Sequence, residues 1–306
     1  MEHKIRYYNA NKFFREKFGE KIIKISLDGG FTCPNRDGKL SYGGCIFCSE
    51  KGSGDFAGDR HLDIEEQFNI NKEKMSKKWK DGKYIAYFQA FTNTYAPLDY
   101  LEKLFTKAST LSDVVGIFIA TRPDCITEDI AKFLSKLNEK IYVCIELGFQ
   151  TSKKESIKLI NRCYNNDVFE NCVKMLNKYK LDVIVHTILG LPYESKLDML
   201  NTIKYVSQFD IKGIKLQLLH VIQDTALHKL YKANPFKILS LEEYVDIVVS
   251  CIEILPPDIV IHRITGDGDK NTLVEPKWSL NKKLVLNSIN KELNIRDTYQ
   301  GKFYIK

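Results

Sequence analysis

Residues 29–50, GGFTCPNRDGKLSYGGCIFCSE, place three cysteines, Cys33, Cys45 and Cys48, in one glycine-rich loop with the spacing C-x11-C-x2-C. An apolar segment at residues 21–27 predicts a β-strand that leads directly into this loop. Three thiolates so close in sequence suit a soft metal or an iron–sulfur cluster. A structural zinc site normally takes four protein ligands, and residues 29–50 contain no fourth cysteine or histidine. Three ligands on a four-iron cluster would leave one iron open to bind another molecule.

The rest of the chain alternates between apolar segments and amphipathic ones. Further buried strands are expected at residues 84–91, 114–120, 141–149, 182–190, 213–222 and 259–264, and helices at 63–80, 97–109, 127–138, 152–162, 167–179, 195–208 and 240–254. Near-continuous apolar strands separated by helices are typical of a parallel sheet that is covered on both faces. An open iron followed by such strand–helix units is the arrangement of a radical S-adenosylmethionine (SAM) enzyme.

Seven strands are one short of a complete (β/α)8 barrel. We therefore predict an α/β fold, a partial (β/α)6-type barrel with a mostly parallel sheet and outer helices. A doubly wound open sheet is the alternative. No linker or break in composition divides the sequence, so residues 1–306 are expected to form one domain, with helical extensions at about 1–20 and 278–306.

The chain carries 46 Lys and Arg against 39 Asp and Glu, a formal net charge of +7. This excess permits an anionic partner such as RNA without requiring one. The N-terminal segment lacks the apolar stretch of a signal peptide, and no apolar run reaches the roughly 20 residues of a membrane helix. We expect a cytoplasmic protein with no membrane partner. Its other cysteines are expected to be buried apolar side chains rather than disulfides: Cys125, Cys144, Cys163, Cys172 and Cys251.

Basic and aromatic residues gather in three segments, residues 4–17, 77–83 and 296–306. In the first segment one helical face is aromatic, and two interpretations are open for it. The helix either caps the bottom of a barrel or forms a contact surface for RNA, since aromatic rings beside cations can stack on bases. The aromatic residues are Tyr7, Tyr8, Phe13, Phe14 and Phe18.

Polar residues collect in and just after the predicted strands, where a parallel α/β fold places its chemistry. A charge on a buried strand costs several kcal/mol unless it is paired, so polar residues on several strands suggest a shared polar cavity. For each single residue a local ion pair is the simpler explanation. The residues concerned are Gln89, Thr121, Arg122, Glu146, Gln150, His186, Lys215, Gln217, His220, His262 and Arg263.

Several of these segments resemble the YhcC/YtqA-like family of radical SAM proteins, and the resemblance spans about residues 5–300. The similar stretches are CPNRDGKLSYGGCIFC (33–48), FQAFTNTYAP (88–97), ATRPD (120–124), IELGFQTS (145–152), HTILGLPYES (186–195) and LQLLHVIQDTALHKLY (216–231). The later stretches also resemble the radical SAM domain of the Elongator catalytic subunit. Most radical SAM enzymes have C-x3-C-x2-C and a GGE-like motif, whereas this chain has a longer first gap and QAFTN at 89–93.

The resemblance implies the cofactors and the site. Cys33, Cys45 and Cys48 would bind a [4Fe–4S] cluster whose fourth iron chelates SAM, and an electron from the cluster would cleave SAM to methionine and a 5′-deoxyadenosyl radical. Phe47 is expected against the adenine. Other candidates for contacts with SAM are Gln89, Thr121, Glu146, Gln150 and His186, and candidates for contacts with the substrate are Arg122, Gln217 and His220.

The resemblance further implies tRNA as the substrate, at the C5 side chain of the wobble uridine, with carboxymethylaminomethyl converted toward aminomethyl. The three basic segments would hold the phosphates, and a flavodoxin or ferredoxin would supply electrons. Two alternatives stay open: a radical SAM enzyme acting on a small metabolite or peptide, and a metal-binding protein without enzymatic activity.

Overall fold

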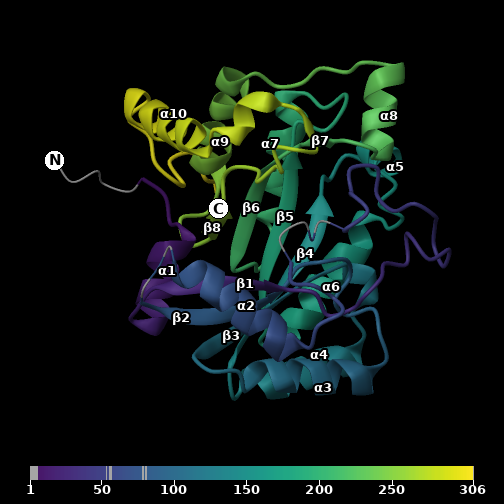
Figure 1. Ribbon diagram of the computed structural model, residues 1–306. Coiled ribbons are helices and arrows are strands. Elements are labelled where there is room, and N and C mark those ends of the chain that lie inside the picture. The colour runs from purple at the N-terminus through teal and green to yellow at the C-terminus, as the bar shows by residue number, and fades with distance from the viewer. Residues whose placement is uncertain (1–5, 53, 55–56, 78, 80, 306) are drawn as a thin grey trace.

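The computed structural model describes residues 6–52, 54, 57–77, 79 and 81–305 of the chain. Seven strands form one sheet in the order β1-β2-β3-β4-β5-β6-β8, and every neighbouring pair is parallel. The strands are β1 (Ile22–Leu27), β2 (Lys83–Phe88), β3 (Val114–Thr121), β4 (Tyr142–Gln150), β5 (Asp182–Leu189), β6 (Gly213–Leu218) and β8 (Val260–Arg263). The sheet curls into an open barrel with β1 and β8 at its edges (Figure 1), which confirms the predicted partial barrel.

Helices connect the strands and cover the outer face of the sheet (Figure 1). They are α2 (Ile64–Ser76), α3 (Leu98–Ser109), α4 (Glu128–Asn138), α5 (Lys154–Leu159), α6 (Asn166–Lys178), α7 (Lys196–Val206) and α9 (Leu241–Ile254). The sequence did not predict helix α8 (Ala226–Ala233), nor the small antiparallel sheet of β7 (Val221–Ile222) and β9 (Leu273–Glu275). The expected strand 213–222 is therefore two strands, with a break at residues 219–220.

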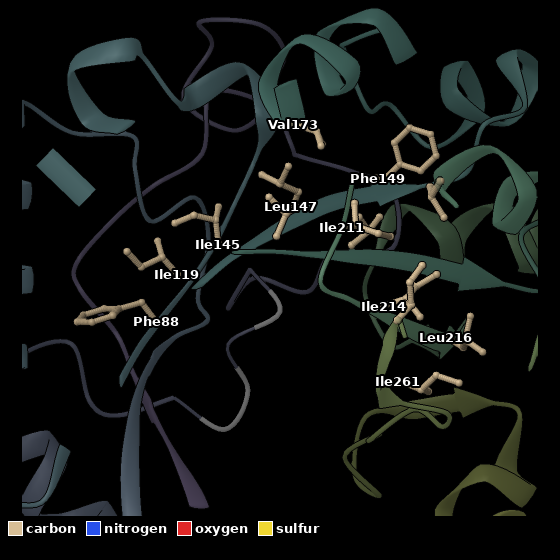
Figure 2. Packing of buried hydrophobic residues seen from close by; sticks show 14 of the residues in the cluster. Phe88, Ile119, Ile145, Leu147, Phe149, Val173, Ile211, Ile214, Leu216 and Ile261 are labelled. Atoms are coloured by element: carbon tan, nitrogen blue, oxygen red, sulfur yellow. The ribbon is translucent and has the colours of Figure 1, made fainter. Parts of the chain in front are cut away.

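Successive side chains along each strand point to opposite faces of the sheet, so one set packs in the outer core and the other fills the barrel interior. Side chains of one parity point outward and pack under the helices, and Figure 2 shows part of this layer, including Ile119, Ile145 and Leu147 on two neighbouring strands. Side chains of the other parity point inward. Near the strand beginnings the interior is apolar, and farther along the strands it becomes charged and polar. The apolar part includes Ile85, Phe118, Cys144, Ile184 and Val260.

Helix α1 (Ala10–Phe18) closes the bottom of the barrel. Asn9 caps it, since its side chain accepts a hydrogen bond from the Lys12 N–H at 2.9 Å. Phe13 and Phe14 are buried among the apolar interior residues, and Phe14 lies 5.9 Å from the Phe118 ring. Because these rings face the barrel, they are not available to stack on RNA bases. The first of the two sequence interpretations, a cap on the bottom of the barrel, agrees with this packing.

The two ends of the described chain meet beside α1. The Tyr8 N–H donates to the Gln300 side chain at 2.8 Å, and the Gln300 amide donates to the carbonyls of Pro256 and Ile259. Helix α10 (Lys282–Ile295) packs on α9. None of the described helices combines the length and apolar composition of a membrane span. Cys144, Cys172 and Cys251 are buried as expected, but Cys163 is exposed and Cys125 is partly exposed, because both lie in loops rather than in core elements.

Candidate active site at the carboxyl ends of the strands

The cysteine loop follows β1 and bends sharply at two glycines. Gly43 and Gly44 have φ of +81° and +84°, a region that glycine adopts without strain. A Cβ on Gly44 would lie 2.9 Å from the Arg36 side chain, which crosses the loop to donate to the Glu50 and Ser49 carbonyls. Tight turns follow Cys33 and Cys45: the Arg36 N–H donates to the Cys33 carbonyl and the Cys48 N–H to the Cys45 carbonyl. The backbone thus folds the three cysteines toward one side.

Two asparagines attach this loop to the segment after α5. The Asn35 amide donates to the Asn161 carbonyl at 2.6 Å and lies 3.6 Å from Cys45 Sγ. Asn161, in the left-handed region with φ of 55°, donates from its own amide to the Gly44 carbonyl at 2.9 Å. The Ile46 N–H also donates to the Ile160 carbonyl, and the Leu227 N–H of α8 donates to the Ile46 carbonyl. The loop is therefore fixed by segments far away in sequence.

All three cysteines line one cavity of about 170 Å³ above the barrel. The Cys48 thiol beside Cys45, together with burial, raises the pKa of Cys45 well above its ordinary value. The raised pKa disfavours the thiolate form of Cys45, and a bound metal cation would stabilise that form. Among the described residues, no group of three or more His, Cys, Asp or Glu side chains is placed to hold a single metal ion. Each cysteine of a four-iron cluster binds a different iron, so a soft-donor set spread around a cavity fits such a cluster.

The cavity also gathers most of the predicted cofactor contacts. Phe47, Gln89, Thr121, Glu146, Gln150 and His186 all line it, as do Arg122 and Gln217. Gln150 is unusual in two ways: its φ is 65°, and its buried Oε1 lacks a hydrogen-bond partner within the described chain. A strained residue with an unpartnered polar atom at a cavity suggests a contact with a ligand. The Thr121 hydroxyl is already bonded to the Thr94 hydroxyl at 2.6 Å.

Below the cysteines, Glu146 is fully buried and lies at the centre of an ion cluster. Its Oε2 lies 2.5 Å from Lys215 Nζ and 2.8 Å from His186 Nε2, while its Oε1 lies 3.2 Å from Lys24 Nζ. Lys215 Nζ also donates to the Tyr87 hydroxyl at 3.0 Å. Every one of these side chains points into the barrel because the inward parity of β1, β2, β4, β5 and β6 places it there.

The cluster fixes protonation states. Burial alone would raise the pKa of Glu146, but the charges of Lys215 and Lys24 and the His186 hydrogen bond hold it well below its usual range. Burial lowers the pKa of His186 to about 4, so at pH 7 the ring is neutral and donates its Nε2–H to Glu146. Burial lowers the pKa of Lys215 to about 7, and the positive charges of Lys24 and Arg263 add to this effect while Glu146 opposes it.

A second cavity, of about 870 Å³, opens between the two edges of the sheet and joins the first. Phe47, Gln89, Gln217 and Arg263 line both. Of the predicted substrate contacts, Gln217 and His220 line this lateral cavity. Arg122 does not, because it faces the cysteines and forms a two-pronged ion pair with Asp124.

Several residues at the site were not predicted from the sequence. Lys24 could have been found, since it alternates with Ile23 and Ile25 in a predicted strand and so must face inward. Nothing in the sequence around Asn35 or Asn161 indicates that these residues hold the cysteine loop. Arg162 is 1% exposed and donates to the carbonyls of Phe149, Thr151 and Tyr164, which shapes the cavity wall from a loop.

Two protein-family models match this chain. The sequence model of the Radical SAM superfamily matches residues 33–206, more than half of the chain, and that of the Radical_SAM C-terminal domain matches residues 211–294. The chain belongs to the radical SAM superfamily. Its radical SAM region begins at Cys33 and runs through β5 and α7, the part that carries the three cysteines, Glu146 and His186.

Relatives refine this assignment. The uncharacterized protein YtqA of Bacillus subtilis is 49% identical over 299 residues, covering 98% of this chain and 93% of YtqA. Elongator complex protein 3 of Homo sapiens is 25% identical over 181 residues, covering 57% of this chain and 31% of that protein. The solved structure of Methanocaldococcus infernus Elp3 with an N-terminal deletion has a TM-score of 0.68 at 19% identity, covering 91% of this chain and 64% of that one. The YtqA-like family and the relationship to Elongator, both expected from sequence, are confirmed.

Membership of the superfamily also confirms the cofactors, a [4Fe–4S] cluster and SAM, and with them an enzyme rather than a metal-binding protein without activity. When bound, these groups supply an electron and a carbon-centred radical that removes hydrogen from an unactivated C–H bond. The chain's own task is to hold, orient and shield them. Apolar Phe47 and Ile188 wall off the cavity, which limits side reactions of a radical with water.

Asn35 provides a test of how the loop acts on the cluster. Its amide N–H points at Cys45 Sγ, and hydrogen bonds to ligating sulfur stabilise the reduced, more negative form of a cluster. We expect Asn35→Ala to shift the reduction potential to more negative values, measured by redox titration followed by electron paramagnetic resonance. Asn71→Ala is the matched control, because Asn71 donates to the Ser26 carbonyl away from the cysteines. An unchanged potential in Asn35→Ala would show that this contact has no electronic role.

Proposed function

We propose that this radical SAM enzyme modifies tRNA at the C5 side chain of the wobble uridine, converting carboxymethylaminomethyl toward aminomethyl. The observation that carries the proposal is similarity over 181 residues to Elongator complex protein 3, together with the lateral cavity described above. We further propose that Phe47, Gln89, Thr121, Glu146, Gln150 and His186 serve SAM, directly or by fixing the cavity wall. Gln217 and His220 would serve the substrate, with Arg122 placed on the cysteine side.

The lateral cavity suits one extruded nucleoside. Its volume of about 870 Å³ lies in the range of small-ligand sites, and it leads from the protein surface to the cysteine cavity. An enzyme that acts on a base must take that base out of its stack. The His220 ring lies in the wall of this cavity against Gly266 and Gly268, where an added Cβ would come within 2.4 and 3.2 Å of the ring. Burial lowers the pKa of His220 to about 4, so it would meet the substrate as a neutral ring.

The basic segments differ in their suitability for tRNA. Lys78 and Lys80 lie outside the described residues. In the terminal segments, Arg6 pairs with Asp297, and Arg296 pairs with Asp246 and Glu292, so these charges serve the fold at the bottom of the barrel. Lys21, Trp79 and Lys282 line the lateral cavity instead, with Lys21 Nζ over the Trp79 ring. A cation beside an aromatic ring at the cavity rim suits phosphate contact and base stacking.

The test is nucleoside mass spectrometry of tRNA from a strain that lacks the protein. We expect carboxymethylaminomethyl uridine to accumulate and aminomethyl uridine to disappear, and expression of the wild-type chain, but not of a Cys33→Ala chain, to restore the wild-type pattern. The enzyme would then act in the cytoplasm with a flavodoxin or ferredoxin as electron donor. Identical wobble nucleosides in deletion and wild-type strains would sink the tRNA proposal and favour a small metabolite or peptide.

A further inference from the structure

Positive charge exceeds negative charge around the two cavities. Two carboxylates, Glu146 and Asp267, are shared by four cations, Lys24, Lys215, Arg263 and Lys282. The cations outnumber the carboxylates even when Lys215, whose environment disfavours its charge, is neutral. Unpaired charge in a partly buried site is costly, so a bound anion would relieve it.

Arg263 is the cation best placed to receive that anion. It ends β8, lines both cavities and is 28% exposed. Its Nη2 lies 3.2 Å from Asp267, and within the described part of the chain the guanidinium makes no other ion pair or hydrogen bond. Guanidinium presents five donors in a planar fork that matches a carboxylate, so one edge remains for a ligand.

Gln217 adds a second donor beside it. This residue also lines both cavities, on β6, and its side-chain amide has no hydrogen-bond partner in the portion of the chain that is described. β6 and β8 are paired in the sheet, with Lys215 opposite Arg263 in the register. A charged fork and a neutral amide therefore face the passage between the SAM cavity and the lateral cavity.

We propose that Arg263, with Gln217, forms a subsite for a substrate carboxylate. Resting on the proposed function, the inference assigns this subsite to the carboxylate of the carboxymethylaminomethyl side chain. Bound there, the CH2 between amine and carboxylate would lie in the passage beside the cysteine cavity, and the uracil would remain in the lateral cavity. The subsite would also distinguish substrate from product, because the aminomethyl side chain carries no carboxylate and would meet surplus positive charge.

Three sources of an oxyanion must be separated: the substrate carboxylate, the SAM carboxylate and a tRNA phosphate. The position of Arg263 favours the substrate carboxylate. The passage lies within the barrel, where a backbone phosphate would have to enter with its sugar. Arg122 lines only the cysteine cavity, whereas Arg263 lines that cavity and the lateral one.

The experiment uses the reconstituted holoenzyme and sarcosine (N-methylglycine), which reproduces the carboxymethylamino group. We expect wild type to bind sarcosine in calorimetry, Arg263→Gln to bind it about tenfold or more weakly, and Arg263→Lys to fall between. Asp267 keeps its partner Lys282 at 2.6 Å in both variants, so the fold should survive. Arg6→Gln is the matched control: Arg6 is 26% exposed and paired with Asp297, far from both cavities.

SAM and inorganic phosphate serve as the other probes. Unchanged SAM affinity in Arg263→Gln, with sarcosine bound more tightly than phosphate by wild type, supports the subsite. Equal loss of SAM affinity would assign Arg263 to SAM, and preference for phosphate would assign it to the nucleic-acid backbone; either result overturns the proposal, as does a wild type that does not bind sarcosine.

A kinetic measurement tests whether the subsite recognises the tRNA substrate. With tRNA that carries carboxymethylaminomethyl uridine, Arg263→Gln should raise KM about tenfold or more. An unaltered KM overturns the subsite while the tRNA function stands. If the deletion strain shows normal tRNA, the function falls, and sarcosine binding still decides whether Arg263 recognises a carboxylate.

Discussion

Replacing Cys33, Cys45 and Cys48 together by alanine removes the iron–sulfur cluster from the purified protein and abolishes all cleavage of SAM. The reason is the ligand set: the loop places three soft thiol ligands around one cavity, and no further cysteine is among the described residues that line it. Iron analysis should fall from about four irons per chain to almost none. The brown absorption of the cluster should vanish, and no 5′-deoxyadenosine should form with dithionite and SAM.

Four single variants at the other cysteines provide the control. Cys125→Ala, Cys163→Ala, Cys172→Ala and Cys251→Ala should each keep the wild-type iron content. Cys125 is the most informative, because the charge of Cys33 contributes to its raised pKa and so places it near the loop. Iron retained in the triple variant, or lost in Cys125→Ala, would contradict the assignment of the three ligands.

Glu146→Ala is expected to destabilise the protein by about 3–5 kcal/mol, the usual effect of removing one partner from a buried ion pair. Glu146 is the only carboxylate that Lys24 and Lys215 contact within the described chain, and Lys215 is 4% exposed. Both ammonium groups would be left inside the barrel without a counter-charge. Urea unfolding of the apoprotein, followed by circular dichroism, measures the change in free energy of unfolding.

The double variant Glu146→Gln with Lys215→Met separates stability from cofactor binding. It removes one negative and one positive charge together, so most of the lost stability should return. SAM affinity of this reconstituted variant then tests the sequence-based expectation that Glu146 supports SAM, with an expected loss of about 1.5–3 kcal/mol. Wild-type SAM affinity in the double variant would limit Glu146 to holding the barrel interior together. Wild-type stability of Glu146→Ala would contradict the ion cluster itself.

The parts of this molecule that sequence predicts well are local. Each predicted apolar run contains a strand, although 213–222 is divided into β6 and β7, because a parallel sheet buried on both faces requires near-continuous apolar residues. The cysteine ligands were predictable from their spacing in one loop. The sequence indicated a site role for Glu146, because the charge of a lone carboxylate in an apolar strand has to be compensated by a partner.

The side chains that compensate the charge of Glu146 could not be predicted from the sequence. Its partners Lys24 and Lys215 are 122 and 69 residues away, and only the curl of the sheet brings them together. The same holds for Asn35 and Asn161, joined across 126 residues. Helix α8 was missed because ALHKLYKA is short and follows a break in the preceding strand. Arg122, predicted as a substrate contact, lines the cysteine cavity and pairs with Asp124 two residues later, a placement that the sequence did not indicate.

The meeting of the two ends of the described chain beneath the barrel sets an order on folding. The segment before Phe13 and Phe14 pairs with Ile261 and Gln300, which are far away in sequence. Contacts across about 290 residues form slowly, because a long loop must close before they can stabilise anything. The bottom of the barrel therefore closes late in folding, after the strands that Phe13 and Phe14 cover have come together.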